Sequence, residues 1–63
     1  MLVEEVDVYE VHLLDRTTNE VLQTFDAGTN YDLAVRTKDD WDIQYSDGTM
    51  YTKIEIYAED VED

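Results

Sequence analysis

The pattern of apolar and polar residues in the first half of the chain predicts two extended segments. Val6–Leu14 is rich in β-branched and aromatic residues and contains no turn-forming residue, which is typical of a β-strand. Neither of its alternating faces is wholly polar, as expected for a central strand or for one with a β-bulge. Asp15–Asn19 has the composition of a turn, and Glu20–Phe25 resumes the extended pattern. The first half therefore predicts an antiparallel hairpin.

A break at Asp26–Gly28 separates this hairpin from a segment with two interpretations. Thr29 and Asp32 have the spacing of a helix capping box, which favours a helix of about two turns. The apolar residues of 30–38 also fit the alternation of a strand, so a strand remains open for the same segment.

The second half of the chain predicts another hairpin. Trp41, Ile43 and Tyr45 alternate with polar residues, and Asp47–Gly48 supplies the positive φ values that tight hairpin turns require. The alternation resumes over residues 50–59. We therefore predict an α+β fold, in which a small antiparallel sheet of two hairpins has one short helix between them. An all-β five-stranded meander or small barrel is the alternative.

Length and composition limit the organisation of the chain. Its 63 residues predict one small domain over residues 1–63, with a frayed acidic tail at 59–63. The absence of Cys excludes a disulfide framework and a thiolate metal site. No run of about 18 apolar residues is present, and the N-terminus is acidic where a secretory signal is basic. We expect a soluble cytoplasmic protein.

The net charge limits the partners that the protein can bind. The chain has 17 Asp and Glu against 4 Lys and Arg, which gives a formal charge of −13. Nucleic acids and anionic membranes are bound through Lys and Arg, so we expect direct binding to neither. The same field attracts basic protein surfaces, and clefts that bind nucleic acids are among the most positive. We predict a protein partner with such a cleft and leave a homodimer open.

Catalytic and metal chemistry have little support in the sequence. His12 is the only histidine and Ser46 the only serine, so a Ser-His-acid triad requires these two residues to meet. The aspartates around residue 42 fail the calcium-loop pattern, because Tyr45 stands where the invariant glycine belongs. The two glycines of the chain cannot form a Gly-rich phosphate loop. We expect no enzymatic activity, no cofactor and no dedicated metal site.

The distribution of carboxylates gives the main functional signal. Residues i and i+2 of a strand lie about 6.6–6.8 Å apart on one face, a spacing on the order of that between DNA phosphates. If the second hairpin forms, Asp40, Asp42, Glu55 and Glu59 share one exposed surface. The predicted partner-binding residues are seven carboxylates and one tyrosine: Asp39, Asp40, Asp42, Asp47, Glu55, Tyr57, Glu59 and Asp60.

Size, charge, lack of Cys and the element order over Val6–Val61 resemble the small acidic proteins that phages and mobile elements direct against DNA-handling enzymes. These include uracil-DNA glycosylase inhibitors and the anti-CRISPR and anti-restriction proteins that mimic DNA. The segment Lys53–Ile56 looks like the last strand of the shortest, dimeric glycosylase inhibitors of phages that infect Bacillus. With the two patterns aligned at Gly28, Leu33 and Ala34 stand where that family has its functional aromatic residue and glutamate. The inhibitory residues of that family therefore do not carry over.

The charge and the resemblance predict an inhibitor that mimics nucleic acid and blocks the basic groove of an enzyme or defence effector, in the host cytoplasm if the chain is phage-encoded. A second hypothesis belongs to another class: a non-enzymatic structural or assembly module that dimerises or docks through its apolar face. In that case Trp41, Tyr45, Tyr51 and Tyr57 carry the function, and acidity serves solubility or salt adaptation.

Overall fold

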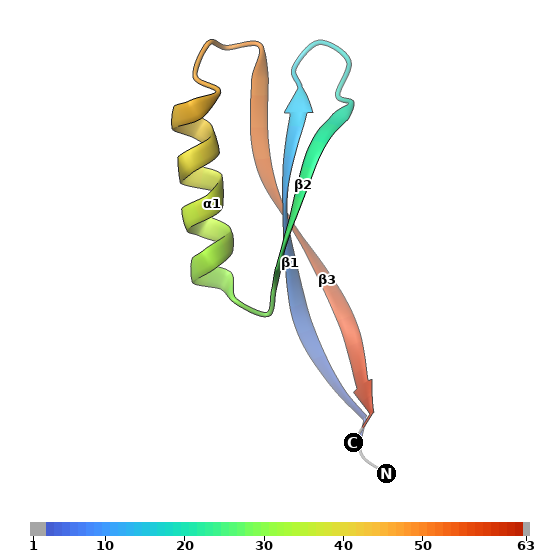
Figure 1. Ribbon diagram of the computed structural model, residues 1–63. Helices are drawn as coiled ribbons and strands as arrows, with labels where there is room; N and C mark the ends of the chain where they lie inside the picture. The colour runs from blue at the N-terminus through green and yellow to red at the C-terminus, as the bar shows by residue number, and fades with distance from the viewer. Residues whose placement is uncertain (1–2, 63) are drawn as a thin grey trace.

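The computed structural model describes residues 3–62, with side chains over residues 5–60. Its elements are β1 (Val3–Asp15), β2 (Val21–Gly28), α1 (Tyr31–Gln44) and β3 (Met50–Glu62). The three strands form one antiparallel sheet in the order β2–β1–β3, and α1 packs against one face of it (Figure 1). The predicted α+β class is confirmed.

The predicted first hairpin is present, with longer strands than the sequence pattern indicated. β1 is the central strand, as its two mixed faces suggested. In the turn, the Asp15 carboxylate accepts hydrogen bonds from the backbone N–H groups of Thr17 and Thr18 at 2.7 and 3.1 Å. Asn19 adopts a φ of 61°, a left-handed conformation that asparagine tolerates better than most residues. Local hydrogen bonds therefore close the turn.

The first strand of the predicted second hairpin is the last turn of α1 with its C-cap, Tyr45, so that hairpin does not form. The segment 30–38 is helical, as favoured, but the helix has 14 residues, and Asn30 caps it instead of Thr29. The Asn30 Oδ1 accepts the backbone N–H of Leu33 at 3.0 Å. Trp41 lies seven residues after Ala34, two helical turns along the same face, and both pack on the core. This packing decides in favour of the helix.

The Asp47–Gly48 pair does form a turn, but the turn joins a helix to a strand. The Asp47 carboxylate accepts hydrogen bonds from the backbone N–H and the hydroxyl of Thr49, at 3.1 and 2.8 Å. Gly48 has a φ of 88°, which a residue with a Cβ rarely adopts. The dipeptide indicated the change of direction correctly and did not specify which elements it connects.

The core lies where α1 crosses the sheet. Val11 of β1, Ala27 of β2 and Ala34 of α1 are buried together, and the two alanines allow the helix to approach the strands closely. The half-buried residues packed around them are Tyr9, Phe25, Trp41 and Ile54. Leu13 and Leu14 of β1 are buried as well. Every buried residue among the described side chains therefore lies between residues 11 and 34.

Two strands continue beyond this core. β2 ends at Gly28, opposite Tyr9, so residues 3–8 of β1 pair only with residues 57–62 of β3. Figure 1 shows these two segments projecting past both α1 and β2, in a molecule that measures 49 × 23 × 11 Å. We call residues 3–8 and 57–62 the ribbon, and residues 9–56 the covered half.

The C-terminal end differs from its predicted form. Fraying was expected over 59–63, but residues 59–62 belong to β3 and pair with residues 3–6 of β1. Residue 63 lies outside the described residues. Pairing with β1 gives this acidic end a defined position next to the acidic start of the chain.

Candidate functional site

The ribbon is the most acidic part of the molecule. By sequence, its two six-residue segments contain six of the 17 acidic residues and no Lys, Arg or His. These residues are Glu4, Glu5, Asp7, Glu59, Asp60 and Glu62. The four whose side chains are described, residues 5, 7, 59 and 60, are all exposed. The ribbon therefore concentrates negative charge without a compensating cation of its own.

Three carboxylates share one face of the ribbon. Glu5 and Asp60 stand directly opposite each other in the β1–β3 ladder, and Asp7 lies two residues further along β1 on the same side. Opposite residues have Cβ atoms about 4.5–5.5 Å apart, so Glu5 and Asp60 form a like-charge pair that destabilises the sheet. The ribbon thus holds carboxylates in a close array at a cost in stability.

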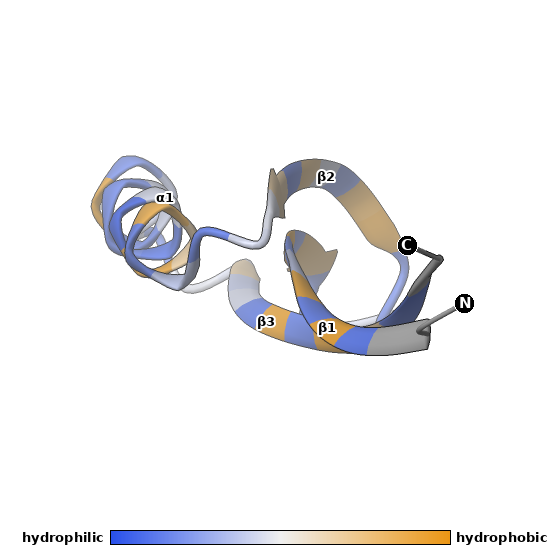
Figure 2. Cartoon of the chain, turned by 90° about the horizontal axis from the view of Figure 1, so that it is seen from below, coloured by the Kyte–Doolittle hydropathy of each residue, from blue (hydrophilic) through white to orange (hydrophobic). Residues whose placement is uncertain are grey.

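The other face of the ribbon is mostly apolar. Val8 pairs with Tyr57, and Val6 pairs with Glu59, in the same ladder. Both valines are half-buried, whereas the Tyr57 side chain is 45% exposed. Seen from below, β1 and β3 alternate between hydrophilic and hydrophobic residues towards their ends (Figure 2). The ribbon therefore has one acidic face and one mostly apolar face that also carries Glu59.

The predicted partner-binding residues lie in several places. Asp39, Asp40 and Asp42 belong to α1, and Asp47 lies in the connection to β3. Glu55, Tyr57 and Glu59 alternate with Ile54, which packs on the core, so they occupy the sheet face that is turned away from α1. Asp60 lies on the opposite face of the ribbon.

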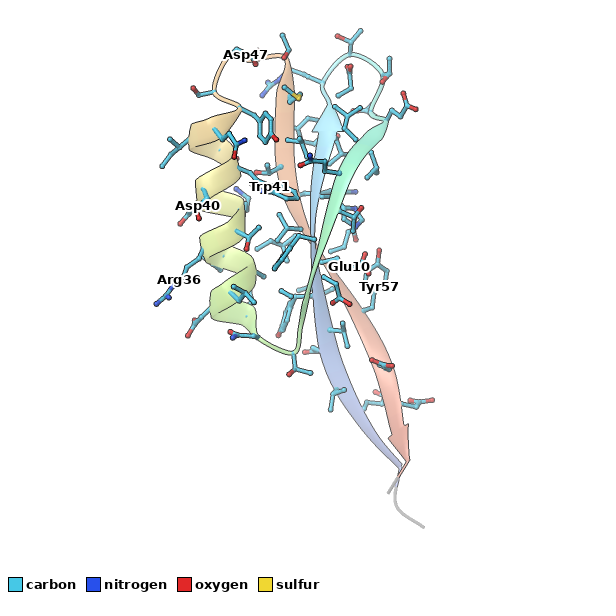
Figure 3. The ribbon with its side chains drawn as sticks, viewed as in Figure 1. Glu10, Arg36, Asp40, Trp41, Asp47 and Tyr57 are labelled. Carbon is cyan, nitrogen blue, oxygen red and sulfur yellow. The ribbon has the colours of Figure 1, made fainter. Side chains whose placement is uncertain are left out.

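The surface that Asp40, Asp42, Glu55 and Glu59 were expected to share does not exist. The first two residues are on the helix, and the other two are on the sheet face away from that helix. Figure 3 shows Asp40 pointing outward from α1 and Tyr57 on the other side of the sheet. The prediction failed because the strand assigned to residues 41–45 is helical.

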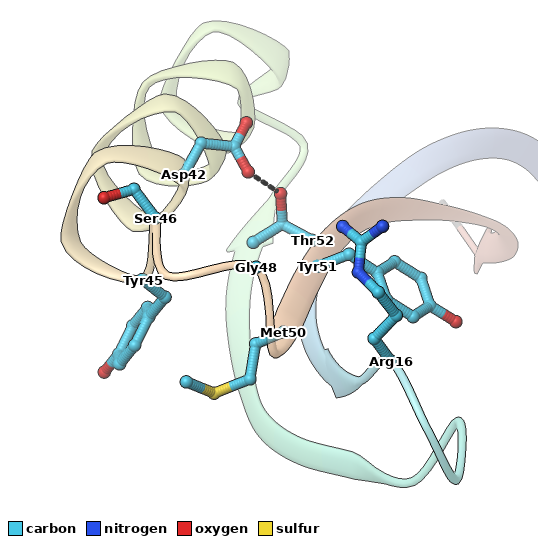
Figure 4. A pocket seen from close by; sticks show the side chains of 8 residues that line it. All are labelled: Arg16, Asp42, Tyr45, Ser46, Gly48, Met50, Tyr51 and Thr52. Atoms are coloured by element: carbon cyan, nitrogen blue, oxygen red, sulfur yellow. Dashed lines mark hydrogen bonds between the residues drawn. The ribbon is translucent and has the colours of Figure 1, made fainter.

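Asp42 connects two elements of the fold. Its carboxylate accepts a hydrogen bond from the Thr52 hydroxyl of β3 (Figure 4). The same carboxylate lies 2.9 Å from the Lys38 Nζ. The hydrogen bond from Thr52, followed by that from Lys38, lowers the pKa of Asp42 below its ordinary value. This carboxylate holds α1 against the sheet, and each of its two oxygens already accepts one hydrogen bond within the fold.

Asp47 is also occupied locally. Hydrogen bonds from the backbone N–H and then the hydroxyl of Thr49 lower the pKa of the Asp47 carboxyl group. Figure 3 places this residue at the end of the molecule opposite the ribbon. It caps its own turn and stands apart from the ribbon carboxylates.

Carboxylates on the open face of the covered half have hydrogen-bonding partners, and Lys53 adds a positive charge among them. Glu10 and Glu55 are direct neighbours across β1 and β3. The His12 Nε2 lies 3.0 Å from the Glu10 Oε1, and the Lys53 Nζ lies 2.5 Å from the Glu55 Oε1. The hydrogen bond with Lys53 lowers the pKa of Glu55, and the same bond raises the pKa of Lys53. This is the compensation that the ribbon lacks.

Glu5 and Asp7 are candidate residues that the sequence analysis missed. The predicted first strand began at Val6, and nothing in the sequence pattern indicated that β3 would extend far enough to pair with residues 3–8. A signal was nevertheless available, because both ends of the chain are acidic and contain no Lys or Arg.

A shallow hollow of about 340 Å³ lies at the end of the covered half far from the ribbon (Figure 4). Its lining residues are Arg16, Asp42, Tyr45, Ser46, Gly48, Met50, Tyr51 and Thr52. The Arg16 guanidinium lies over the Tyr51 ring, 6.0 Å from its centroid. Ser46 lines the hollow but His12 does not, so the two residues of the hypothetical triad do not meet there.

The comparisons with protein-family models, curated proteins and solved structures found no match to this chain. Among the residues that the structure describes, no group of three His, Asp or Glu side chains is placed to hold a metal ion. Over residues 3–62, no helix has the length and apolar character needed to cross a membrane. The function is therefore argued from charge and geometry alone.

Proposed function

We propose that this protein is a nucleic-acid-mimicking inhibitor whose ribbon enters the basic groove of a DNA- or RNA-binding enzyme or defence effector. The observation that carries the proposal is the pairing of two segments that together hold six carboxylates and no cation. A groove that binds phosphates through Lys and Arg supplies the positive charge that the ribbon lacks.

The shape of the ribbon supports this proposal. Carboxylates on one strand repeat every 6.6–6.8 Å or so, on the order of the phosphate spacing in DNA. The ribbon is two strands wide and projects beyond α1 and β2 (Figure 1). It can therefore enter a groove that is too narrow for the covered half.

The electrostatics give a second line of support. The net charge of −13 opposes folding by self-repulsion, and the Glu5–Asp60 pair adds a local cost. A basic partner reduces both the overall self-repulsion and the repulsion between Glu5 and Asp60. Binding therefore offsets a loss of stability that is present in the free protein. Association of this kind is fast at low ionic strength and weakens as salt screens the charges.

The alternative, an assembly module that docks through aromatic residues, has less support. Trp41 packs on the core. The Tyr51 hydroxyl donates a hydrogen bond to the Asn19 side chain at 2.9 Å, so this ring is held within the fold. Of the four aromatic residues in that hypothesis, Tyr57 alone has a side chain classed as exposed, and it lies on the ribbon.

The proposal is tested by competition with DNA. A uracil-DNA glycosylase, a CRISPR effector and a restriction endonuclease are each bound to fluorescent duplex DNA, and displacement by the protein is followed by anisotropy. The ribbon variant Glu5→Gln/Asp7→Asn/Asp60→Asn should lose displacement by at least about tenfold, because three contacts to basic residues are removed.

The matched control is Glu20→Gln/Asp39→Asn/Asp40→Asn, which removes three exposed charges from the covered half. Both variants have a net charge of −13 + 3 = −10. The control should compete almost as well as the natural chain. Equal losses in the two variants, or no displacement from any of the basic proteins, would contradict the proposal.

A further inference from the structure

The ribbon has a free backbone edge in addition to its charge. Residues 3–8 of β1 pair with β3 on one side, and β2 occupies the other side of β1 only from Tyr9 to Leu14. Within the described part of the chain, no strand pairs with that other side of residues 3–8. A row of backbone N–H and C=O groups is therefore open to a further strand.

The departure of β2 from β1 is fixed by local structure. Gly28, the last residue of β2, has a φ of 60°, and its N–H donates to the Asp26 carboxylate at 2.8 Å. The chain then turns towards α1 and leaves its place beside β1 vacant (Figure 1). An incoming strand would pair with residues 3–8 on the same side of β1 on which β2 pairs with Tyr9–Leu14.

The side chains beside this edge specify the incoming strand. Glu5 and Asp7 lie on one face and Val6 and Val8 on the other, because neighbouring strand residues alternate between faces. An added strand alternates in the same way. It matches the ribbon best when its residues are basic on the first face and apolar on the second.

An aromatic pair stands at the inner end of the edge. The Tyr31 ring packs edge-on against Tyr9, with ring centroids 5.1 Å apart and an interplanar angle of 64°. The Tyr31 side chain is 52% exposed and can accept a Lys or Arg against its face. In Figure 1 the lower part of β1 lies on the side of α1, and the lower part of β3 lies on the far side of β1. The inner end of the β1 edge therefore offers this additional contact.

A second copy of the chain is a poor occupant. It would bring its own Glu5, Asp7 and Asp60 against the same three carboxylates, and like charges across a strand pair are destabilising. Charge complementarity selects a basic strand instead.

We propose that residues 3–8 of β1 bind, by β-strand addition, an extended segment of a partner protein in which Lys or Arg alternates with apolar residues. Backbone hydrogen bonds supply affinity in this mode, and the alternating side chains supply specificity. The inference goes beyond the proposed function, because it requires a basic strand and not a nucleic-acid groove.

The test uses a capped synthetic peptide of alternating Lys and Val. Two further versions carry backbone N-methyl groups, one on three Lys residues and the other on three Val residues. Alternate residues of a strand direct their N–H groups to the same edge, so each version lacks three N–H groups on one edge of the peptide. Because one edge of the added strand faces β1 and the other faces solvent, one methylated peptide should lose affinity by about tenfold or more while the other binds within about threefold. Equal binding of the two methylated peptides would overturn the inference.

A block-sequence peptide of the same composition, with its Lys and Val residues segregated, controls for simple charge attraction. It should bind about tenfold more weakly than the alternating peptide, because it cannot place every Lys on one face. Equal affinity would reduce the interaction to non-specific attraction and would overturn the inference.

Amide hydrogen exchange locates the peptide. Alternate amides within residues 3–8 should become protected when the unmodified peptide is added, because only every second N–H points to the free edge. Protection confined to β3, or protection of no ribbon amide, would also overturn the inference. Loss of DNA competition with retention of peptide binding would contradict the proposed function alone.

Discussion

The covered half and the ribbon are parts of one continuous sheet, yet they handle like-charge pairs in opposite ways. In the covered half, the Glu10–Glu55 pair is accompanied by His12 and Lys53 on the same face. In the ribbon, the opposed Glu5 and Asp60 have no cation within either segment. Compensation of charge stops where the helix and β2 stop. The comparison indicates that one part of β1 and β3 belongs to a stable scaffold, and that another part of the same two strands carries an uncompensated charged surface.

The two regions also differ in what holds them together. Val11 is completely buried in the covered half, whereas no described side chain of the ribbon is buried, and Tyr57 has 45% of its surface exposed. An isolated two-stranded hairpin is marginally stable at best in water. The ribbon therefore depends on its continuity with the covered half, which contains the hydrophobic core.

The largest expected effect is on the core. Leu13 is 2% exposed, and Leu13→Ala should lower the free energy of unfolding by about 3 kcal/mol through lost burial and a residual cavity. The matched change in the ribbon, Val6→Ala, should cost less than about 1 kcal/mol, because Val6 is only half-buried. Denaturant unfolding measures both, and similar losses would show that the ribbon also contributes a core.

A smaller effect is expected at the bond between α1 and β3. Thr52→Val preserves the shape of the side chain and removes the hydroxyl that donates to Asp42, so it should lower the free energy of unfolding by about 1 kcal/mol at pH 7. The pKa of Asp42 should rise towards its ordinary value of 3.8, as an NMR titration can measure. An unchanged pKa would mean that this bond does not hold the helix in solution.

The same variant makes a prediction about pH. A carboxyl group with a lowered pKa contributes stability above its unfolded pKa and loses that contribution as the pH falls through its folded pKa. The stability difference between the natural chain and Thr52→Val should therefore be full at neutral pH and should shrink as the pH falls below 3.8. A difference that grew in acid would contradict the assignment.

The smallest expected effect is in the ribbon, and its sign is opposite. Glu5→Lys converts the pair with Asp60 from like to opposite charges and should raise the free energy of unfolding by about 0.5 kcal/mol at low salt. Glu5→Gln, which only removes the repulsion, should give a smaller gain. Both gains should decrease in high salt as the charges are screened. A loss of stability in Glu5→Lys would show that the natural pair is not repulsive.

The sequence predicted the first hairpin, and it predicted the helix with a cap one residue too early, at Thr29 instead of Asn30. Local chemistry determines both features. Asp15 and its neighbours form the turn through their own hydrogen bonds, and Asn30 terminates the extended chain by capping α1. These signals involve residues that are close in the chain, and such signals can be recognised without knowledge of the tertiary contacts.

The rest of the helix could not be predicted in this way. Trp41, Ile43 and Tyr45 alternate as strand residues do, but Ile43 is 76% exposed, so the alternation does not report a buried face. The true signal was the spacing of Ala34 and Trp41 on one helical face. Only the position of the sheet shows which of the two patterns is buried, and that position depends on contacts that are distant in the sequence.

The candidate site was predicted in part. Glu59 and Asp60 belong to the ribbon, as does Tyr57, whereas the helical aspartates do not. Glu5 and Asp7 were missed, because their proximity to Asp60 arises from pairing between the two ends of the described chain. The total charge could be counted from the sequence, whereas the concentration of that charge on one surface could not be predicted from it.

The pairing of β1 with β3 has a consequence for assembly. Paired residues are between 50 − 15 = 35 and 62 − 3 = 59 positions apart, from Asp15 with Met50 to Val3 with Glu62. Pairings this distant in sequence are slow to form, because a long loop must close before any contact is gained. Because the chain is made from its N-terminus, residues 3–8 are synthesised before residues 57–62 and have no β3 partner in the interval. The negative charge of that segment then discourages premature pairing with other nascent chains.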